Sequence, residues 1–247
     1  MRSRPLLVSI GMALATLGAL AAVGTARAGT PELPSEFRKA PWTTRTLSVG
    51  APNDGHLVRG RRLRPSSSLR LWNGNDVPSH ATPQLLKTLE RAAERVRAAH
   101  PGSAVVVHAL SHEKGGAIRG KRSHRSGRDA DLVLFAVDAK GKPAVAKKLT
   151  RYGTSGKADG LAFDDARNWA LVEALSRDES VTHLFLSSAL RTRLLAWARS
   201  ARKDEARVEK VVAILFADDG DEPSDALLHV RVACPKDQAA ICVESSR

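Results

Sequence analysis

The feature that most restricts how this chain can fold is a Gly-rich, charged loop at residues 111–129, with the sequence SHEKGGAIRGKRSHRSGRD. It separates two apolar runs, AVVVHAL at residues 104–110 and ADLVLFAV at residues 130–137. Both runs have the β-branched and apolar content of buried strands. The chain therefore joins two of its strands by a long polar loop rather than by a helix.

Further elements are predicted on both sides of this loop. One helix begins after Thr82, which can cap it, with Pro83 at the first helical position, and it ends before Pro101-Gly102. The other predicted elements are a short strand at 68–72, helices at 164–178, 188–202 and 204–216, and strands at 181–187 and 227–234. This order predicts an α+β domain, with a small, largely antiparallel sheet and helices packed on one side of it. A doubly wound nucleotide-binding fold is disfavoured because no Gly-rich phosphate loop follows the first strand.

The N-terminal segment predicts export. Residues 1–28 carry Arg2 and Arg4, then an apolar run, and end in Ala26-Arg27-Ala28, the small-x-small pattern of a signal peptide cleavage site. A single membrane anchor is the alternative, although the apolar run is short. No later segment has the ~20 apolar residues of a spanning helix. We expect a flexible, Pro- and Thr-rich lead at residues 29–45 and one domain at 46–247, in the periplasm or outside the cell.

The predicted export affects how the two cysteines and the net positive charge are interpreted. Cys234 and Cys242 are close in sequence, and in an exported chain such a pair predicts a disulfide; a zinc site is less favoured because no second cysteine pair exists. The formal net charge is +13. Basic proteins often bind nucleic acid, but export argues against that partner and favours anionic polymers of the cell envelope. Basicity without a specific partner is an equal alternative.

Three polar side chains around the second strand can form part of a metal site. His124 lies in the loop, and the chain can reverse at Ser126-Gly127 to bring it near Asp131. Asp129 and Asp131 are two residues apart, so in a strand they face the same way, and one can bind a metal while the other orients a ligand. An ordinary polar loop before a strand explains the same residues.

A third ligand has to come from the other histidines. His108 and His183 lie within apolar strands, which favours core positions, whereas His112 shares the loop with His124. His229, in LLHVRV, alternates with Leu227 and Arg231, which places the three on one face of a strand.

The segments SHRSGRDADLVL (residues 123–134) and LLHVRVACP together resemble two motifs of the penicillin-insensitive murein endopeptidases. These enzymes belong to the wider group of lysostaphin, D-Ala-D-Ala metallopeptidases and hedgehog. The resemblance implies a Zn²⁺ site made by His124, Asp131 and His229, with Asp129 beside it, and a cysteine in a disulfide at Cys234. It also implies hydrolysis of D-amino-acid peptide crosslinks in peptidoglycan, with the peptide stems as binding partner and without a serine nucleophile.

The chain departs from the family pattern at three polar positions. Leu227 replaces the first histidine of a His-x-His pair, the residue expected to carry the proton during hydrolysis; Ser224 and Lys121 replace two other histidines. Asp225, Glu222 and His112 are the candidates for a substitute catalytic base. Two hypotheses follow: an active zinc endopeptidase with an altered base, or a catalytically impaired relative that binds zinc and peptidoglycan or a partner.

Overall fold

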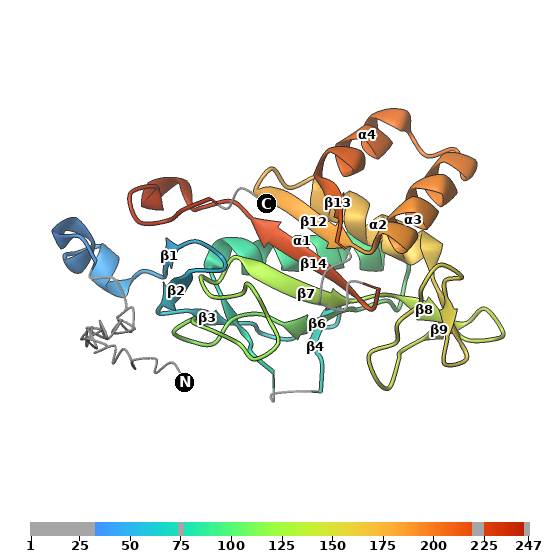
Figure 1. Cartoon of the computed structure of the whole chain (residues 1–247), viewed down its shortest axis with the longest axis horizontal. Helices are drawn as coiled ribbons and strands as arrows, with labels where there is room; N and C mark the ends of the chain where they lie inside the picture. The colour runs from blue at the N-terminus through green and yellow to red at the C-terminus, as the bar shows by residue number, and fades with distance from the viewer. Residues whose placement is uncertain (1–32, 74–76, 219–224, 245–247) are drawn as a thin grey trace, which may run out of the picture. The chain divides into compact units, whose positions relative to one another are not determined.

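The computed structural model describes residues 33–73, 77–218 and 225–244, and these form the predicted α+β fold (Figure 1). Its centre is a six-stranded sheet with the strand order β13-β12-β14-β7-β6-β4. The three inner pairings, β12 with β14, β14 with β7 and β7 with β6, are antiparallel, whereas β13 and β4 join the two edges in parallel. The predicted signal peptide lies outside the described residues.

The bounds of the central strands are β4 (Leu69–Leu71), β6 (Val105–Ala109), β7 (Asp129–Val133), β12 (Val181–Leu186), β13 (Leu215–Ala217) and β14 (Leu227–Val232). Smaller sheets are formed by β1 (Leu47–Gly50) with β2 (Gly55–Val58), by β3 (Arg61–Arg62) with β5 (His80–Ala81), and by β8 (Ala136–Val137), β9 (Pro143–Ala144), β10 (Lys157–Ala158) and β11 (Leu161–Phe163). Three short 3₁₀ turns are η1 (Ser35–Arg38), η2 (Trp42–Thr44) and η3 (Lys236–Gln238).

Four α-helices are present in the described part, and each begins at a capping side chain. In α1 (Pro83–Ala99), the Thr82 hydroxyl accepts a hydrogen bond from the Leu85 N–H, as predicted. Asp164, Ser187 and Asp204 cap the others in the same way; these are α2 (Asp165–Ser176), α3 (Ser188–Ser200) and α4 (Glu205–Ile214). None of the helices among these residues is long and apolar enough to cross a membrane.

The two faces of the central sheet differ in character because strand side chains alternate. One face carries Leu184, Leu228, Val230, Leu132 and Val107, which are buried in the main core together with the apolar stripes of the helices. Figure 1 shows α1 and α2 behind the strands on this side. Among the described residues no helix packs on the opposite face, called the helix-free face here, and it carries the polar residues described below.

Two predicted elements have different limits in the structure. The helix expected at 204–216 ends at Ile214, and Leu215–Ala217 instead pair with β12 as β13, because Leu215 is fully buried beside Leu184. The run 130–137, expected as one strand, divides into β7 and β8. The Phe135 N–H donates to the side chain of Asn168 rather than to a neighbouring strand, so the pairing of β7 ends before this residue.

The ends of the described chain meet. The predicted disulfide between Cys234 and Cys242 is formed, and Gly50 pairs with Cys242. Within the segment expected as a flexible lead, Phe37 is buried against Leu47 and Ile241. The boundary between lead and domain at residue 46 stays a prediction.

Candidate metal centre

Strands β7 and β14 bring four polar side chains together on the helix-free face. Their antiparallel register places His229 opposite Asp131 and Arg231 opposite Asp129. Directly opposed residues on antiparallel strands have Cβ atoms ~5 Å apart, so each pair is in contact. The alternation predicted for β14 therefore holds, and Leu227 faces Val133 on the same side.

His124 reaches this face from the loop. Its backbone is in the left-handed region, with φ 68°, and the Ser111 hydroxyl donates to its carbonyl oxygen. Its side chain is fully buried. At the nearby turn, Gly127 has φ 77°, a conformation that favours glycine, and a Cβ there would lie 2.5 Å from a methyl carbon of Leu57 and displace it. The loop thus closes over the sheet, and the ligand atoms of His124, Asp131 and His229 all lie within 4.8 Å of one another.

The hydrogen bonds of His124 determine which ring nitrogen is bare. Its Nδ1 lies 3.1 Å from the carbonyl oxygen of Leu110, which can only accept, so Nδ1 carries the hydrogen. The Nε2 of a neutral ring then presents a lone pair. That atom is buried, has no hydrogen-bond partner within the described part of the chain, and lies 3.2 Å from Oδ1 of Asp131. Two electron-rich atoms that face each other in a buried position repel one another unless a cation lies between them. The donor set therefore fits a metal ion.

His229 lies between two carboxylates. Its Nδ1 is 2.8 Å from Oδ1 of Asp131 and its Nε2 is 3.0 Å from Oδ1 of Asp129. Burial alone would lower the pKa of His229, but hydrogen bonds to both carboxylates and their negative charges outweigh it and raise the pKa to about 10. If a metal occupied the Nδ1 side, the Nε2–H would still donate to Asp129.

Asp129 holds its neighbours in place. Its Oδ1 accepts from Nε of Arg231 at 2.7 Å as well as from His229, and its Oδ2 faces the His124 N–H at 3.4 Å. Burial would raise the pKa of this carboxyl group, but the hydrogen bond and charge of His229 and the charge of Arg231 hold it well below its usual range. That Asp129 orients a metal ligand stays a prediction.

Lys121 adds a positive charge to the centre. Its ammonium contacts Oδ2 of Asp131, on the other side of the carboxylate from the histidines. The Lys121 side chain is only 9% exposed. The family that the sequence resembles has a histidine at this position; here a lysine nitrogen contacts the site instead.

The candidate bases lie elsewhere. Asp225 accepts from Nε of Arg151 at 2.8 Å, and His112 is exposed in a shallow pocket beside His80 and Glu113. In the described part of the chain, neither contacts the three candidate ligands. Glu222 and Ser224 lie outside the described residues. Leu227 is buried in a small apolar cluster with Trp72 and Val133.

One histidine that the sequence placed in the core lies beside the centre instead. His108 follows Val106 by two residues, so alternation places it on the helix-free face, and the bulge between Val107 and Ala109 lies opposite Asp131. Its Nδ1 is buried without a partner, and its ring lies 6.3 Å from the Trp72 ring. Burial and the charge of Lys121 lower the pKa of His108. Alternation alone, with Val105 and Val107 facing the core, was the sequence signal that pointed this way.

His183 is likewise not a core residue. It is half-buried on the same face, stacks on Phe185 at 5.5 Å, and Phe185 in turn lies 5.6 Å from the ring of His229.

Two basic residues of the loop have different roles. Lys121 contacts the centre, whereas Arg128 is buried and donates to the carbonyl oxygens of Val232 and Val243. Arg128 therefore anchors the C-terminal segment.

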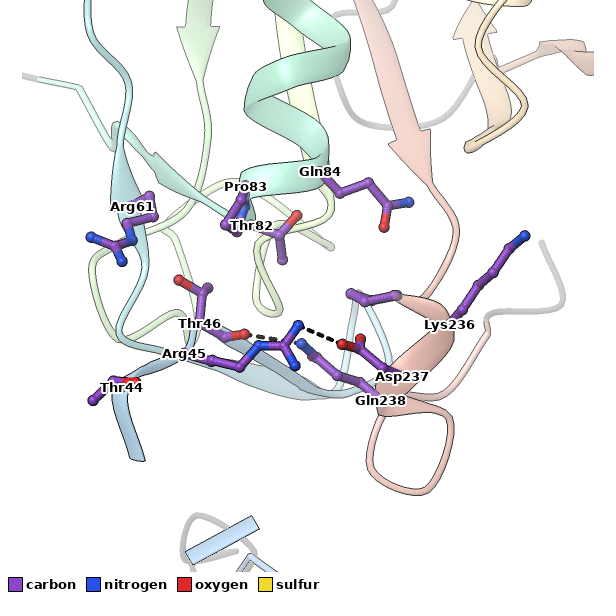
Figure 2. A pocket seen from close by; sticks show the side chains of 11 residues that line it. Thr44, Arg45, Thr46, Arg61, Thr82, Pro83, Gln84, Lys236, Asp237 and Gln238 are labelled. Atoms are coloured by element: carbon purple, nitrogen blue, oxygen red, sulfur yellow. Dashed lines mark hydrogen bonds and ion pairs between the residues drawn. The ribbon is translucent and has the colours of Figure 1, made fainter. Parts of the chain in front are cut away.

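A separate pocket of about 620 Å³ lies at the start of α1 (Figure 2). Arg45 and Asp237 form an ion pair of 2.5 Å across it, and Gln238 donates to the Thr46 carbonyl oxygen. None of the predicted site residues lines it, so it is not part of the candidate centre.

Comparison with known proteins supplies the family. The sequence model of the penicillin-insensitive murein endopeptidases matches residues 60–246, which include all the residues of the candidate centre. A curated protein of Haemophilus influenzae named penicillin-insensitive murein endopeptidase is 25% identical over 229 residues, covering 85% of this chain and 69% of its own length. The chain belongs to the penicillin-insensitive murein endopeptidase family and is thus of a peptidase type that acts on peptidoglycan.

Proposed function

We propose that this protein is a zinc-dependent endopeptidase that hydrolyses D-amino-acid peptide crosslinks in peptidoglycan. The observation that carries the proposal is the bare Nε2 of His124 facing Oδ1 of Asp131 in a buried position. The ion would be held by His124 Nε2, Asp131 and His229 Nδ1. Two imidazoles and one carboxylate are a known ligand set of catalytic zinc, which keeps one further position open.

The surrounding residues suit this role. Leu110 and Asp129 accept from the outer ring nitrogens of His124 and His229 and hold both rings in orientation. When bound, zinc would polarise the scissile carbonyl and make water a better nucleophile.

The proton carrier is the second part of the proposal. Leu227 cannot serve, and Asp225 is paired with Arg151. His108 is the better-placed group, since it lies on the face of Asp131 and its Nδ1 has no hydrogen-bond partner among the described residues. We assign it the proton transfer from water to the leaving amine.

The alternative is a catalytically impaired relative that binds zinc and peptidoglycan. The buried Leu227 favours it, because an apolar side chain stands where the resembling family has a polar one. In either case we propose export with cleavage after Ala28, which agrees with the disulfide between Cys234 and Cys242.

The test uses the exported, processed protein. Bound metal is measured, and crosslinked muropeptides are incubated with the protein, with chelator, and with chelator followed by added zinc. We expect about one zinc per chain and cleavage that chelator stops and zinc restores. Stoichiometric zinc without cleavage would contradict the endopeptidase hypothesis and support the zinc-binding relative. Absence of zinc would contradict both hypotheses.

Two variants make the assignment of ligands specific. His124→Ala should lose the metal. His183→Ala is the control, because His183 is another histidine on this face but lies outside the three-residue group. It should retain the metal.

A further inference from the structure

A groove lies next to the candidate centre on the helix-free face. The register places Arg70, Val106 and Val133 side by side across β4, β6 and β7. This row is two residues along β7 from Asp131. Since strands are ~4.8 Å apart and rise ~3.3 Å per residue, Arg70 is ~12 Å from Asp131.

The groove has a volume of about 670 Å³ and an apolar floor. Val106, Val133 and Trp72 line it from the sheet, and Val145 lines it from the segment after β9. Val145 is 73% exposed, more than any other large apolar side chain in the described part of the chain. An apolar residue held open to solvent at the rim of a groove is typical of a binding surface.

The charge of the groove is positive. Its lining includes Arg70, Lys147 and Arg167 but no acidic residue. Arg167 is neutralised by Asp164 and is buried. Arg70 and Lys147 are exposed, and among the described residues neither makes an ion pair. Two free cations beside an apolar floor favour a ligand with small apolar groups and free carboxylates.

We propose that this groove binds one acidic peptide stem of the crosslinked substrate, with Arg70 and Lys147 facing its carboxylates. The inference rests on the proposed function for the identity of the ligand. An extended peptide spans ~3.3 Å per residue, so a chain whose carbonyl lies at Asp131 reaches Arg70 within about four residues. That length agrees with a short peptide stem, whose alanine methyl groups would contact Val106 and Val133.

The test is binding rather than hydrolysis. A soluble, fluorescently labelled crosslinked muropeptide is titrated with each of three proteins in the presence of chelator. The proteins are wild type, R70A/K147A and R199A/K210A. The last variant is the matched control, since Arg199 and Lys210 are exposed cations on α3 and α4, on the other side of the sheet. A second probe has the same peptide with its carboxylates amidated.

We expect R70A/K147A to bind the acidic probe about tenfold more weakly than wild type, and R199A/K210A to bind it as wild type does. The amidated probe should bind equally weakly to all three proteins. Equal affinity of R70A/K147A and wild type for the acidic probe, or no binding by wild type, would overturn the inference. Because no cleavage is measured, failure of the zinc endopeptidase proposal would leave these results interpretable.

Discussion

Asp129 is the residue at which the reasoning about the centre is most open to test. The change is Asp129→Asn, which keeps the size of the side chain and removes its charge. The carboxylate accepts from Arg231 at 2.7 Å and from His229 at 3.0 Å, and it faces the His124 N–H at 3.4 Å. An amide has one acceptor oxygen, so at least one of these N–H groups would face an NH₂ group instead.

The expected magnitude follows from the role of such a residue. Loss of an orienting partner of a metal-bound histidine costs about 10–100-fold in metal affinity, which is ~1.4–2.7 kcal/mol. Asp129→Ala should cost more, because it leaves the buried guanidinium of Arg231 without its carboxylate; we expect ~3–5 kcal/mol in the free energy of unfolding.

The assay is zinc competition against a chromophoric chelator at neutral pH, with thermal unfolding as a check of the fold. Asp178→Asn is the matched control. Asp178 is also a hydrogen-bonded carboxylate, bound by Thr88, Arg91 and Ser180, but it lies between α1 and the start of β12. A zinc affinity of Asp129→Asn within twofold of wild type, in a folded protein, would refute the assigned role of Asp129.

Three further outcomes are expected. His108→Ala should lower turnover of crosslinked muropeptides about 100-fold with zinc content unchanged, as measured by steady-state kinetics and metal analysis; full turnover would exclude His108 as proton carrier. Cys234→Ser with Cys242→Ser should lower the free energy of unfolding in urea by ~2–3 kcal/mol, the value for a short disulfide loop, and an unchanged midpoint would contradict this. The pKa of Asp178 is lowered, since hydrogen bonds from Thr88 and Ser180 and the charge of Arg91 outweigh burial, so its stabilisation is complete above ~4 and is lost as pH falls through its folded pKa. Asp178→Asn should therefore be less stable at pH 7 and show a smaller loss of stability on acidification, and parallel pH profiles of the two proteins would contradict this.

Part of the candidate centre could be read from local patterns. Period-two alternation predicts that His229 and Arg231 share a face, and that Asp129 and Asp131 do, because successive strand residues point to opposite sides. Alternation within one strand does not say which strand lies beside it. The pairing of β7 with β14, which brings Asp131 against His229 across a sequence separation of 98, is a tertiary choice.

His108 shows the opposite case, in which the apolar character of the neighbouring residues was misleading. An apolar strand context favours a core histidine, and the residues on either side, Val107 and Ala109, are indeed buried. The bulge against Asp131 gives β6 one extra residue, and the extra residue is His108. Alternation within β6 already places His108 on the face of Val106, away from the core; what a single-strand pattern cannot reveal is the bulge, because it depends on the partner strand.

The sequence by itself determined the main helices and strands, the start of the helix capped by Thr82, the disulfide and the two motifs of the family, because these depend on residues close together in the chain. The tertiary structure decided what the motifs do together. Only the packing of the loop over the sheet leaves Nε2 of His124 bare against Asp131, and only the strand order places Arg70 in line with Val106 and Val133. Those relations join residues far apart in sequence, and they are set by which buried faces meet.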